Sequence, residues 1–474
     1  MDDPTALTLR EAAAAIAQGT LRAEALVEAC LDRSARLQPV LNCFIRISDG
    51  AGRAAARAAD GAIKAGRPLG PLHGVPLAHK DMFYRAGEVC SCGSKIRADF
   101  VPDRTATVLT RLDFAGGIEI GRLNMAEFAM GPTGHNDHYG RCRNPWNPDH
   151  ITGGSSSGSG AAVAAGLVFG ALGSDTGGSV RLPAAACGTV GIKPTLGRVS
   201  RYGTMPLSHS LDCIGVLARS VGDCAHLLAV IAGADERDGC ASRSSVPDYE
   251  RAVDEAAERG SLRGLTIGIP ARYYFDGIDG EVADLLSASR AVLEAQGAKV
   301  IDVPVADHGA INDLSNAILW AEAADLHLAW LRERPRDYAA QTRARLLVGL
   351  GVPATLYAQA VRGRAPLLEA LLRDTFARCD ALHVPVLKQP VPTAAETDVG
   401  GSPAMGQVLG QIVANTRPFN YLGLPALSVP IGFTRAGLPQ AMQLVARPFR
   451  EDVLFRIGAA YEAASGLEAR RPPL

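Results

Sequence analysis

The stretch TGGSSSGSGAAVAAGLVFGALGSDTGGS, residues 152–179, holds two loops rich in glycine and serine, with a small-residue helix pattern between them. Glycine lacks side-chain bulk, so the backbone can turn sharply and direct several N–H groups at one point. Such a nest binds either a phosphate or an oxyanion beside a nucleophile. A phosphate loop would carry a Gly-Lys-Ser or Gly-Lys-Thr step, which neither loop has, whereas DTGGS (175–179) ends on a serine. The pattern therefore favours the oxyanion site.

Lysine is rare in this chain, since six of the 48 basic residues are lysines and 42 are arginines. Arginine stays protonated, whereas a buried lysine can lose its proton and act as a base. Lys80 follows the apolar run in PLHGVPLAHKDMF (71–83), which predicts a strand that ends at a turn. A solvated surface lysine is the alternative, but the apolar approach would bury the amine and favours a functional Lys80.

These segments resemble one known family when they are taken together. HGVPLAHKD (73–81), GGSSSGSGAAVAAG (153–166) and GSDTGGSVRLPAAACGTVGIKPT (173–195) are similar to the amidase signature family of Ser–Ser–Lys hydrolases. Its other blocks are matched by LNMAEFAMGPTGHNDHYGRCRNPWNP (123–148), SHSLDCIGVLARSVGDCAHLLAVIAG (208–233) and TRPFNYLGLPALSVPIGFTRAGLPQAMQL (416–444). The resemblance runs from about residue 71 to residue 444, with the blocks in order.

The resemblance implies a catalytic triad. Lys80 is the expected base, Ser155 the bridging serine after a cis peptide bond from Gly154, and Ser179 the nucleophile. A proton would pass from Ser179 to Ser155, and one from Ser155 to neutral Lys80, while Ser179 Oγ attacks the carbonyl carbon. The expected oxyanion hole consists of the backbone N–H groups of Thr176, Gly177, Gly178 and Ser179.

Other polar residues near the loops have structural alternatives. For Ser156, Ser157 and Ser159 we expect hydrogen bonds that shape the first loop. The step Gly158-Ser159-Gly160 lacks the flanking elbow of a lipase. Asp175 is open to a role as a triad acid, but orienting its loop or capping a helix that starts near residue 180 is favoured. The histidines that precede the base, at positions 73 and 79, are expected to be structural.

Composition limits the remaining classes of function. A net charge of −1, no long basic run and 5% aromatic residues argue against a nucleic-acid partner. The N-terminus lacks an apolar signal region, and apolar runs are too short to span a bilayer, so a cytoplasmic protein is expected. The ten cysteines are scattered without zinc-ligand spacing, which indicates free thiols. The HExxH motif is absent as well, so no metal is expected, and no cofactor is predicted.

The chain is expected to form a single α/β/α sandwich, residues 1–474, around a large mixed β-sheet. We expect an N-terminal helical segment (1–66), a signature core (67–222) and a C-terminal part (223–474) that completes the sheet. LRGLTIGIPARYY and LEAQGAKVIDVPV predict strands that flank a helix, a βαβ unit. ALHVPVL and ALSVPIGF predict late strands, and a helical insert at about 309–375 is placed on the substrate side. The sequence does not determine the oligomeric state, and a homodimer is the one assembly considered.

The leading prediction is a free-standing amidase that acts on small, largely uncharged linear amides, including aryl amides and carbamates (urethanes). The main alternative is an amidotransferase A-type subunit that releases ammonia from glutamine for charged tRNA. The tail GLEARRPPL (466–474) favours the free enzyme. A non-catalytic ligand- or nucleotide-binding module is a third hypothesis, but it would not need Lys80, Ser155 and Ser179 together.

The family places its substrate pocket between the segment before the first loop and the helical insert. The substrate-binding candidates are therefore Phe128, Met130, Gly131, Trp320 and Tyr357, with Leu319, Leu346 and Leu350 as further liners. Ordinary helix packing is the alternative for each of them. None is charged, so the set predicts a pocket that selects by apolar area and accepts both aryl and alkyl groups.

Overall fold

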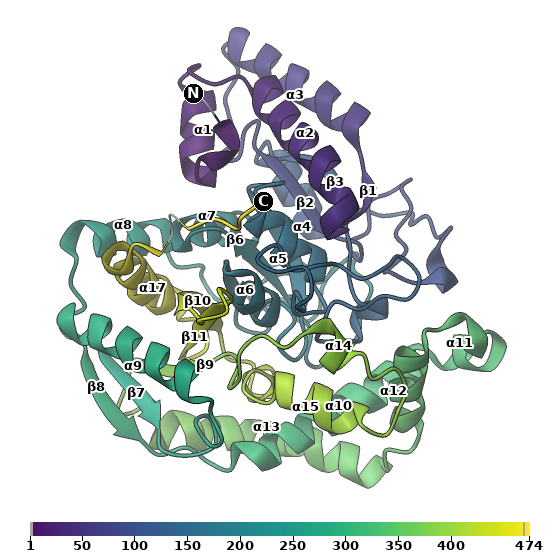
Figure 1. The fold of residues 1–474 in the computed structure, drawn as a ribbon, viewed down its shortest axis with the longest axis vertical. Helices are drawn as coiled ribbons and strands as arrows, with labels where there is room; N and C mark the ends of the chain where they lie inside the picture. The colour runs from purple at the N-terminus through teal and green to yellow at the C-terminus, as the bar shows by residue number, and fades with distance from the viewer. Residues whose placement is uncertain (1–2, 468–469) are drawn as a thin grey trace.

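One mixed β-sheet organises the molecule. The computed structural model describes residues 3–467 and 470–474, so two residues of the predicted segment 1–66 and two of the tail 466–474 lie outside the described residues. Within the described residues, 11 strands form this sheet in the order β1-β3-β2-β4-β6-β5-β10-β11-β9-β7-β8, and helices pack around it (Figure 1). The predicted α/β class with a large mixed sheet is confirmed.

The strands come from all three predicted parts of the chain. Their bounds are β1 Phe44–Ile47, β2 Pro76–Lys80, β3 Ile118–Leu123, β4 Gly170–Asp175, β5 Val190–Lys193, β6 Cys213–Ala218, β7 Thr266–Pro270, β8 Lys299–Val303, β9 Ala381–Pro385, β10 Ala426–Phe433 and β11 Pro439–Ala446. β2 runs parallel to both β3 and β4, while β4 pairs antiparallel with β6. The parallel pair β2 and β4 therefore ends at one edge of the sheet.

The N-terminal segment is mainly helical, with α1 (Leu9–Ala17), α2 (Ala23–Leu41) and α3 (Asp49–Lys64). Thr8 caps α1 in a capping box with Glu11, which satisfies two of the free N–H groups at the helix start. The short strand β1 interrupts the predicted all-helical segment because it pairs with β3, far along the chain. The four residues of β1 are too few to predict a strand from the local sequence, and its partner strand is too distant to be inferred.

Two short helices follow the glycine-rich loops, α5 (Ser157–Ala164) and α6 (Arg181–Cys187). Every residue of both helices is buried. They pack against each other, and α6 also packs on β5, β10 and β11. Gly160 makes the helix contact possible, since a Cβ there would lie 2.8 Å from Pro183 Cβ. A small residue thus lets the two helices pack closely.

The rest of the chain completes the sheet and adds the helical insert. The predicted βαβ unit is present, with α9 (Gly280–Ala295) between the parallel strands β7 and β8. The insert contains α10 (His308–Leu326), α11 (Leu328–Glu333), α12 (Ala340–Leu350) and α13 (Ala354–Asp374), drawn in green in Figure 1. The remaining helices are α4 Thr107–Phe114, α7 Val221–Ile231, α8 Tyr249–Arg259, α14 Ala394–Thr397, α15 Met405–Val413, α16 Arg417–Tyr421 and α17 Glu451–Ser465.

None of the single helices in the described part of the chain is long and apolar enough to cross a membrane. Only α12 and α13 taken together reach the required length and apolarity, and a bend of 91° separates them.

Candidate active site

Lys80 is the last residue of β2 and lies at the edge where the parallel strands β2 and β4 end. The register pairs His79 with Leu172 of β4, which brings Lys80 next to Ser174. Its Nζ donates to Ser155 Oγ at 2.7 Å and to Ser174 Oγ at 2.8 Å. Lys80 is fully buried, and this burial lowers the pKa of its amine to about 7 despite nearby carboxylates. A substantial neutral fraction therefore exists near pH 7, as a general base requires.

The first glycine-rich loop places Ser155 beside this amine. The Gly154–Ser155 peptide bond is cis, and Ser155 is fully buried. The hydroxyls of Ser156, Ser157 and Ser159 donate to the backbone carbonyls of Ser174, Asn124 and Leu172, respectively. These three serines hold the loop against its neighbours, in line with the structural alternative.

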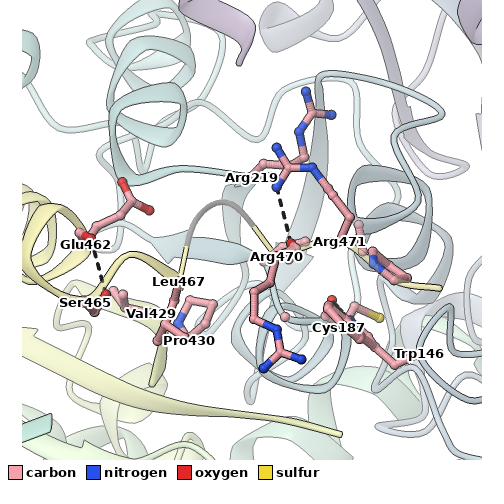
Figure 2. Close-up of a pocket in the computed structure, with 14 residues that line it drawn as sticks. Trp146, Cys187, Arg219, Val429, Pro430, Glu462, Ser465, Leu467, Arg470 and Arg471 are labelled. Atoms are coloured by element: carbon pink, nitrogen blue, oxygen red, sulfur yellow. Dashed lines mark hydrogen bonds between the residues drawn. The ribbon is translucent and has the colours of Figure 1, made fainter. Parts of the chain in front are cut away.

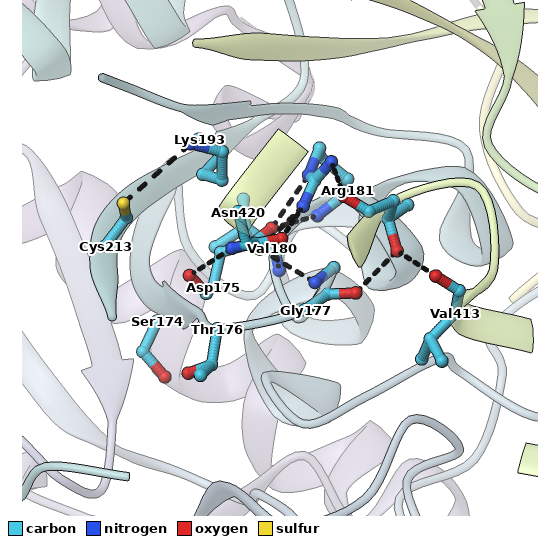
Figure 3. A network of polar contacts seen from close by, with 12 residues as sticks. Ser174, Asp175, Thr176, Gly177, Val180, Arg181, Lys193, Cys213, Val413 and Asn420 are labelled. Atoms are coloured by element: carbon cyan, nitrogen blue, oxygen red, sulfur yellow. Dashed lines mark hydrogen bonds and ion pairs between the residues drawn. The ribbon is translucent and has the colours of Figure 1, made fainter. Parts of the chain in front are cut away.

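The second loop, which carries Ser179, is held by a buried ion pair (Figure 3). Arg181 donates to both oxygens of Asp175, at 2.8 and 3.0 Å, and neither side chain is exposed. Asn420 Nδ2 donates to Asp175 Oδ1 at 2.8 Å, and the N–H groups of Gly178 and Val180 donate to the same carboxylate. Although burial favours the neutral acid, Arg181 lowers the pKa of Asp175 below its usual range. Asp175 thus fixes the loop and the start of α6.

Ser179 faces a narrow cavity of about 30 Å³ together with Thr176 and Gly177. The backbone ties it to the bridging loop, since Ser156 N donates to the Ser179 carbonyl at 3.3 Å. A Ser155–Ser179 hydroxyl hydrogen bond is not among the hydrogen bonds of the described residues. Such contacts are often long in a free enzyme and tighten when substrate binds.

The four predicted oxyanion donors are not equivalent. The N–H of Gly178 already donates to Asp175 Oδ1 at 2.8 Å, so it is not available to a substrate. The N–H groups of Thr176, Gly177 and Ser179 have no acceptor within residues 3–467 and 470–474. These three groups remain the candidates for stabilising a developing oxyanion.

Some of the predicted substrate residues line the cavities, and the others lie elsewhere. Met130, Gly131 and Leu319 line the cavity at Ser179, and Trp320 lines an adjoining cavity of about 450 Å³. Phe128 packs instead against Trp330, with ring centroids 5.5 Å apart. Tyr357 donates to Glu322 at 3.0 Å. Leu346 is buried away from both cavities, and Leu350 is 52% exposed.

Three residues at the site escaped the sequence analysis. Ser174, the second acceptor of Lys80, is a serine in a segment that already supplies the expected nucleophile, and nothing in the pattern distinguishes it. Arg345 and Arg417 line both cavities, so the predicted uncharged pocket carries two cations. Arg417 stands in a block that matches the family, but as one arginine among 42 it gave no signal.

Another cavity lies between β10, the end of α17 and the C-terminal tail (Figure 2). Its lining includes Trp146, Arg219, Glu462, Arg470 and Arg471, and none of the three expected triad residues.

Nine of the ten cysteines are buried free thiols, and Cys240 is exposed. In the described parts of the chain, no group of His, Cys, Asp and Glu side chains is arranged to hold a metal ion.

Comparisons with known proteins define the family of the chain. The family model described as Amidase matches residues 25–455. The chain belongs to the amidase signature family and is an enzyme of the C–N hydrolase or amidotransferase type.

Relatives of both types are similar to it over nearly their whole length. The A-type subunit of the glutamyl-tRNA(Gln) amidotransferase from Chloroflexus aurantiacus is 38% identical, with 99% of this chain and 98% of the relative covered. The structure of 6-aminohexanoate cyclic dimer hydrolase with its substrate has a TM-score of 0.89 at 27% identity, with 99% of both chains covered. The peptide amidase of Stenotrophomonas maltophilia has a TM-score of 0.85 at 30% identity, with 98% of both chains covered.

Proposed function

We propose that the chain cleaves the C–N bond of a small linear amide through an acyl-enzyme on Ser179. The observation that carries this proposal is the 2.7 Å hydrogen bond from Lys80 Nζ to Ser155 Oγ in a fully buried setting. Burial holds the pKa of Lys80 at about 7, so the amine can accept a proton where an exposed lysine cannot. This hydrogen bond connects the base to the first glycine-rich loop. The backbone of that loop is in turn bonded to Ser179, since Ser156 N donates to the Ser179 carbonyl.

The proposed reaction has two stages, the formation of the acyl-enzyme and its hydrolysis. Neutral Lys80 accepts the Ser155 proton, Ser155 accepts the Ser179 proton, and Ser179 Oγ bonds to the carbonyl carbon. When the tetrahedral intermediate collapses, the C–N bond breaks, and a proton returns through Ser155 to the leaving nitrogen. Water then attacks the acyl-enzyme by the same route and releases the acid.

The negative charge of the tetrahedral intermediate would lie at the second loop. The three free N–H groups, those of Thr176, Gly177 and Ser179, are proposed as the oxyanion donors. Removing one such donor in other hydrolases costs about 3 kcal/mol of transition-state stabilisation. The Asp175–Arg181 pair keeps this loop in place before substrate arrives.

Two kinds of substrate are candidates, glutamine and the small amides of a free amidase. The similarity to the A-type subunits of glutamyl-tRNA(Gln) amidotransferases supports release of ammonia from glutamine, with partner subunits, better than it supports a free amidase for neutral aryl amides and carbamates. The similarity to peptide amidase and cyclic dimer hydrolase structures supports a free amidase. Ammonia release from glutamine that depends on added amidotransferase partner subunits would favour the first candidate.

Turnover by matched serine variants tests the shared chemistry. Ser179→Ala should lose at least about 10³-fold in kcat on any amide substrate, because it removes the nucleophile. Ser159→Ala is the control, since this buried serine donates only to the Leu172 carbonyl and should keep most of the activity. An active Ser179→Ala protein would refute the proposed nucleophile.

A further inference from the structure

Two arginines share the cavity of the proposed nucleophile. Arg345 belongs to α12 and Arg417 is the first residue of α16, and both line the cavity at Ser179 as well as the larger one beside it. Arg417 lies directly against the second loop, since a Cβ on Gly177 would be 3.6 Å from its Nε. Their side chains therefore border the space that an amide bound at Ser179 would occupy.

The guanidinium groups of the buried Arg417 and the half-buried Arg345 lack anionic partners. Arg345 makes no hydrogen bond or ion pair with any described residue, and Arg417 has only one partner, Asn312 Oδ1, to which its Nη1 donates at 3.0 Å. Arg345 Nη1 and Arg417 Nε are buried without any acceptor. Burial lowers the pKa of Arg345 to about 10, and burial with the nearby charge of Arg345 lowers that of Arg417 to about 9. Both remain cationic at neutral pH.

The rest of the lining does not neutralise them. The residues that line the two cavities include no aspartate or glutamate. Asp313 attracts Arg417 only from beyond ion-pair distance. Arg417 is buried and Arg345 is half-buried, and two such cations without an anion are costly. A bound carboxylate would supply acceptors for the free N–H groups.

We propose that Arg345 and Arg417 together bind a carboxylate of the amide substrate, and that the preferred substrate has no ammonium group beside that carboxylate. The planar guanidinium matches a carboxylate geometrically. An ammonium group would face two cations with no acidic partner in the lining. The inference rests on the proposed function of Ser179 and replaces the predicted uncharged substrate with an anionic one.

Three related amides test this selection. Glutaramate carries a carboxylate, pentanamide of the same chain length is neutral, and glutamine adds the ammonium group to the carboxylate. Ammonia release should give a kcat/KM for glutaramate about tenfold to 100-fold above that for pentanamide, the range expected for charge-assisted hydrogen bonds. Glutamine should fall below glutaramate. A preference for glutamine over glutaramate would overturn the second part of the proposal.

Arginine variants connect the preference to the two side chains. Arg345→Met and Arg417→Met should each reduce the glutaramate-to-pentanamide ratio toward one, and Arg345→Lys should restore part of it. Arg343→Met is the matched control, because Arg343 is on the same helix, donates to the Pro335 carbonyl and lines neither cavity. An unchanged ratio in both methionine variants would contradict the proposal.

Binding to the Ser179→Ala protein provides a test that needs neither turnover nor an arginine variant. Calorimetric titration should show glutaramate binding about tenfold or more tightly than pentanamide. Equal binding would overturn the carboxylate site even if the enzyme is an active amidase. Preferential binding of glutaramate, combined with full activity of the Ser179→Ala protein, would instead overturn the nucleophile and leave the carboxylate site standing.

Discussion

At the scale of single residues, the chemistry depends on the state of Lys80. The resemblance to the family indicates Lys80, Ser155 and Ser179, and the structure brings the first two within hydrogen-bond distance. Ser174 could not be predicted, because its contact with Lys80 arises from the parallel register of β2 and β4 rather than from its own sequence context. The sequence also could not predict that one of the four expected oxyanion donors, the N–H of Gly178, is already bound to Asp175.

The pKa of Lys80 leads to a prediction on pH. Burial lowers this pKa to about 7, and only the neutral amine can accept a proton, so kcat/KM should rise as the pH rises through about 7 and then level off. Below that point the rate should fall about tenfold per pH unit, as expected for the loss of one essential proton acceptor. The measurement is the pH–rate profile on pentanamide, which does not titrate in this range. A flat profile across neutral pH would contradict the role of Lys80.

At the scale of elements, the backbone of the second loop is tightly constrained. Gly178 has a φ of +133°, and a Cβ there would lie 2.3 Å from Thr416 Oγ1, which itself donates to the Gly177 carbonyl at 2.6 Å. Sequence patterns predicted the βαβ unit and the late strands, because each has a local apolar run. They missed β1, whose pairing partner β3 is distant in sequence.

Gly178→Ala should therefore disturb both stability and activity. We expect a loss of about 2–4 kcal/mol in the free energy of unfolding, from the strained φ and the forced shift of Thr416, with most of the turnover lost. Gly239→Ala is the control, since Gly239 has no positive φ and a Cβ there would meet nothing within 4 Å. Denaturant unfolding and amide turnover of both variants check this. Equal behaviour of the two variants would mean that the loop is not constrained as described.

At the scale of the whole molecule, the site is assembled from segments far apart in the chain. Lys80 comes from the sheet, Ser155 and Ser179 from the two loops, Arg345 from the helical insert, and Arg417 from the block before β10. The sequence predicted the insert as helical and near the substrate, but not the charge that it contributes. That charge depends on how α12 and α16 pack beside the loops, which no local pattern encodes.

The family is shared by free amidases and amidotransferase subunits, so the overall fold does not decide the substrate. Both kinds of enzyme would use the same acyl-enzyme chemistry. The central claim is therefore that Ser179 is the nucleophile of this chain.

Labelling of the isolated chain with a fluorophosphonate tests that claim most directly. Intact-mass measurement should show one adduct, and peptide mapping should locate it on Ser179. Labelling should increase as the pH rises through about 7, together with the deprotonation of Lys80. An adduct on Ser155, Ser159 or another serine, or no adduct on a chain that hydrolyses amides, would contradict the account.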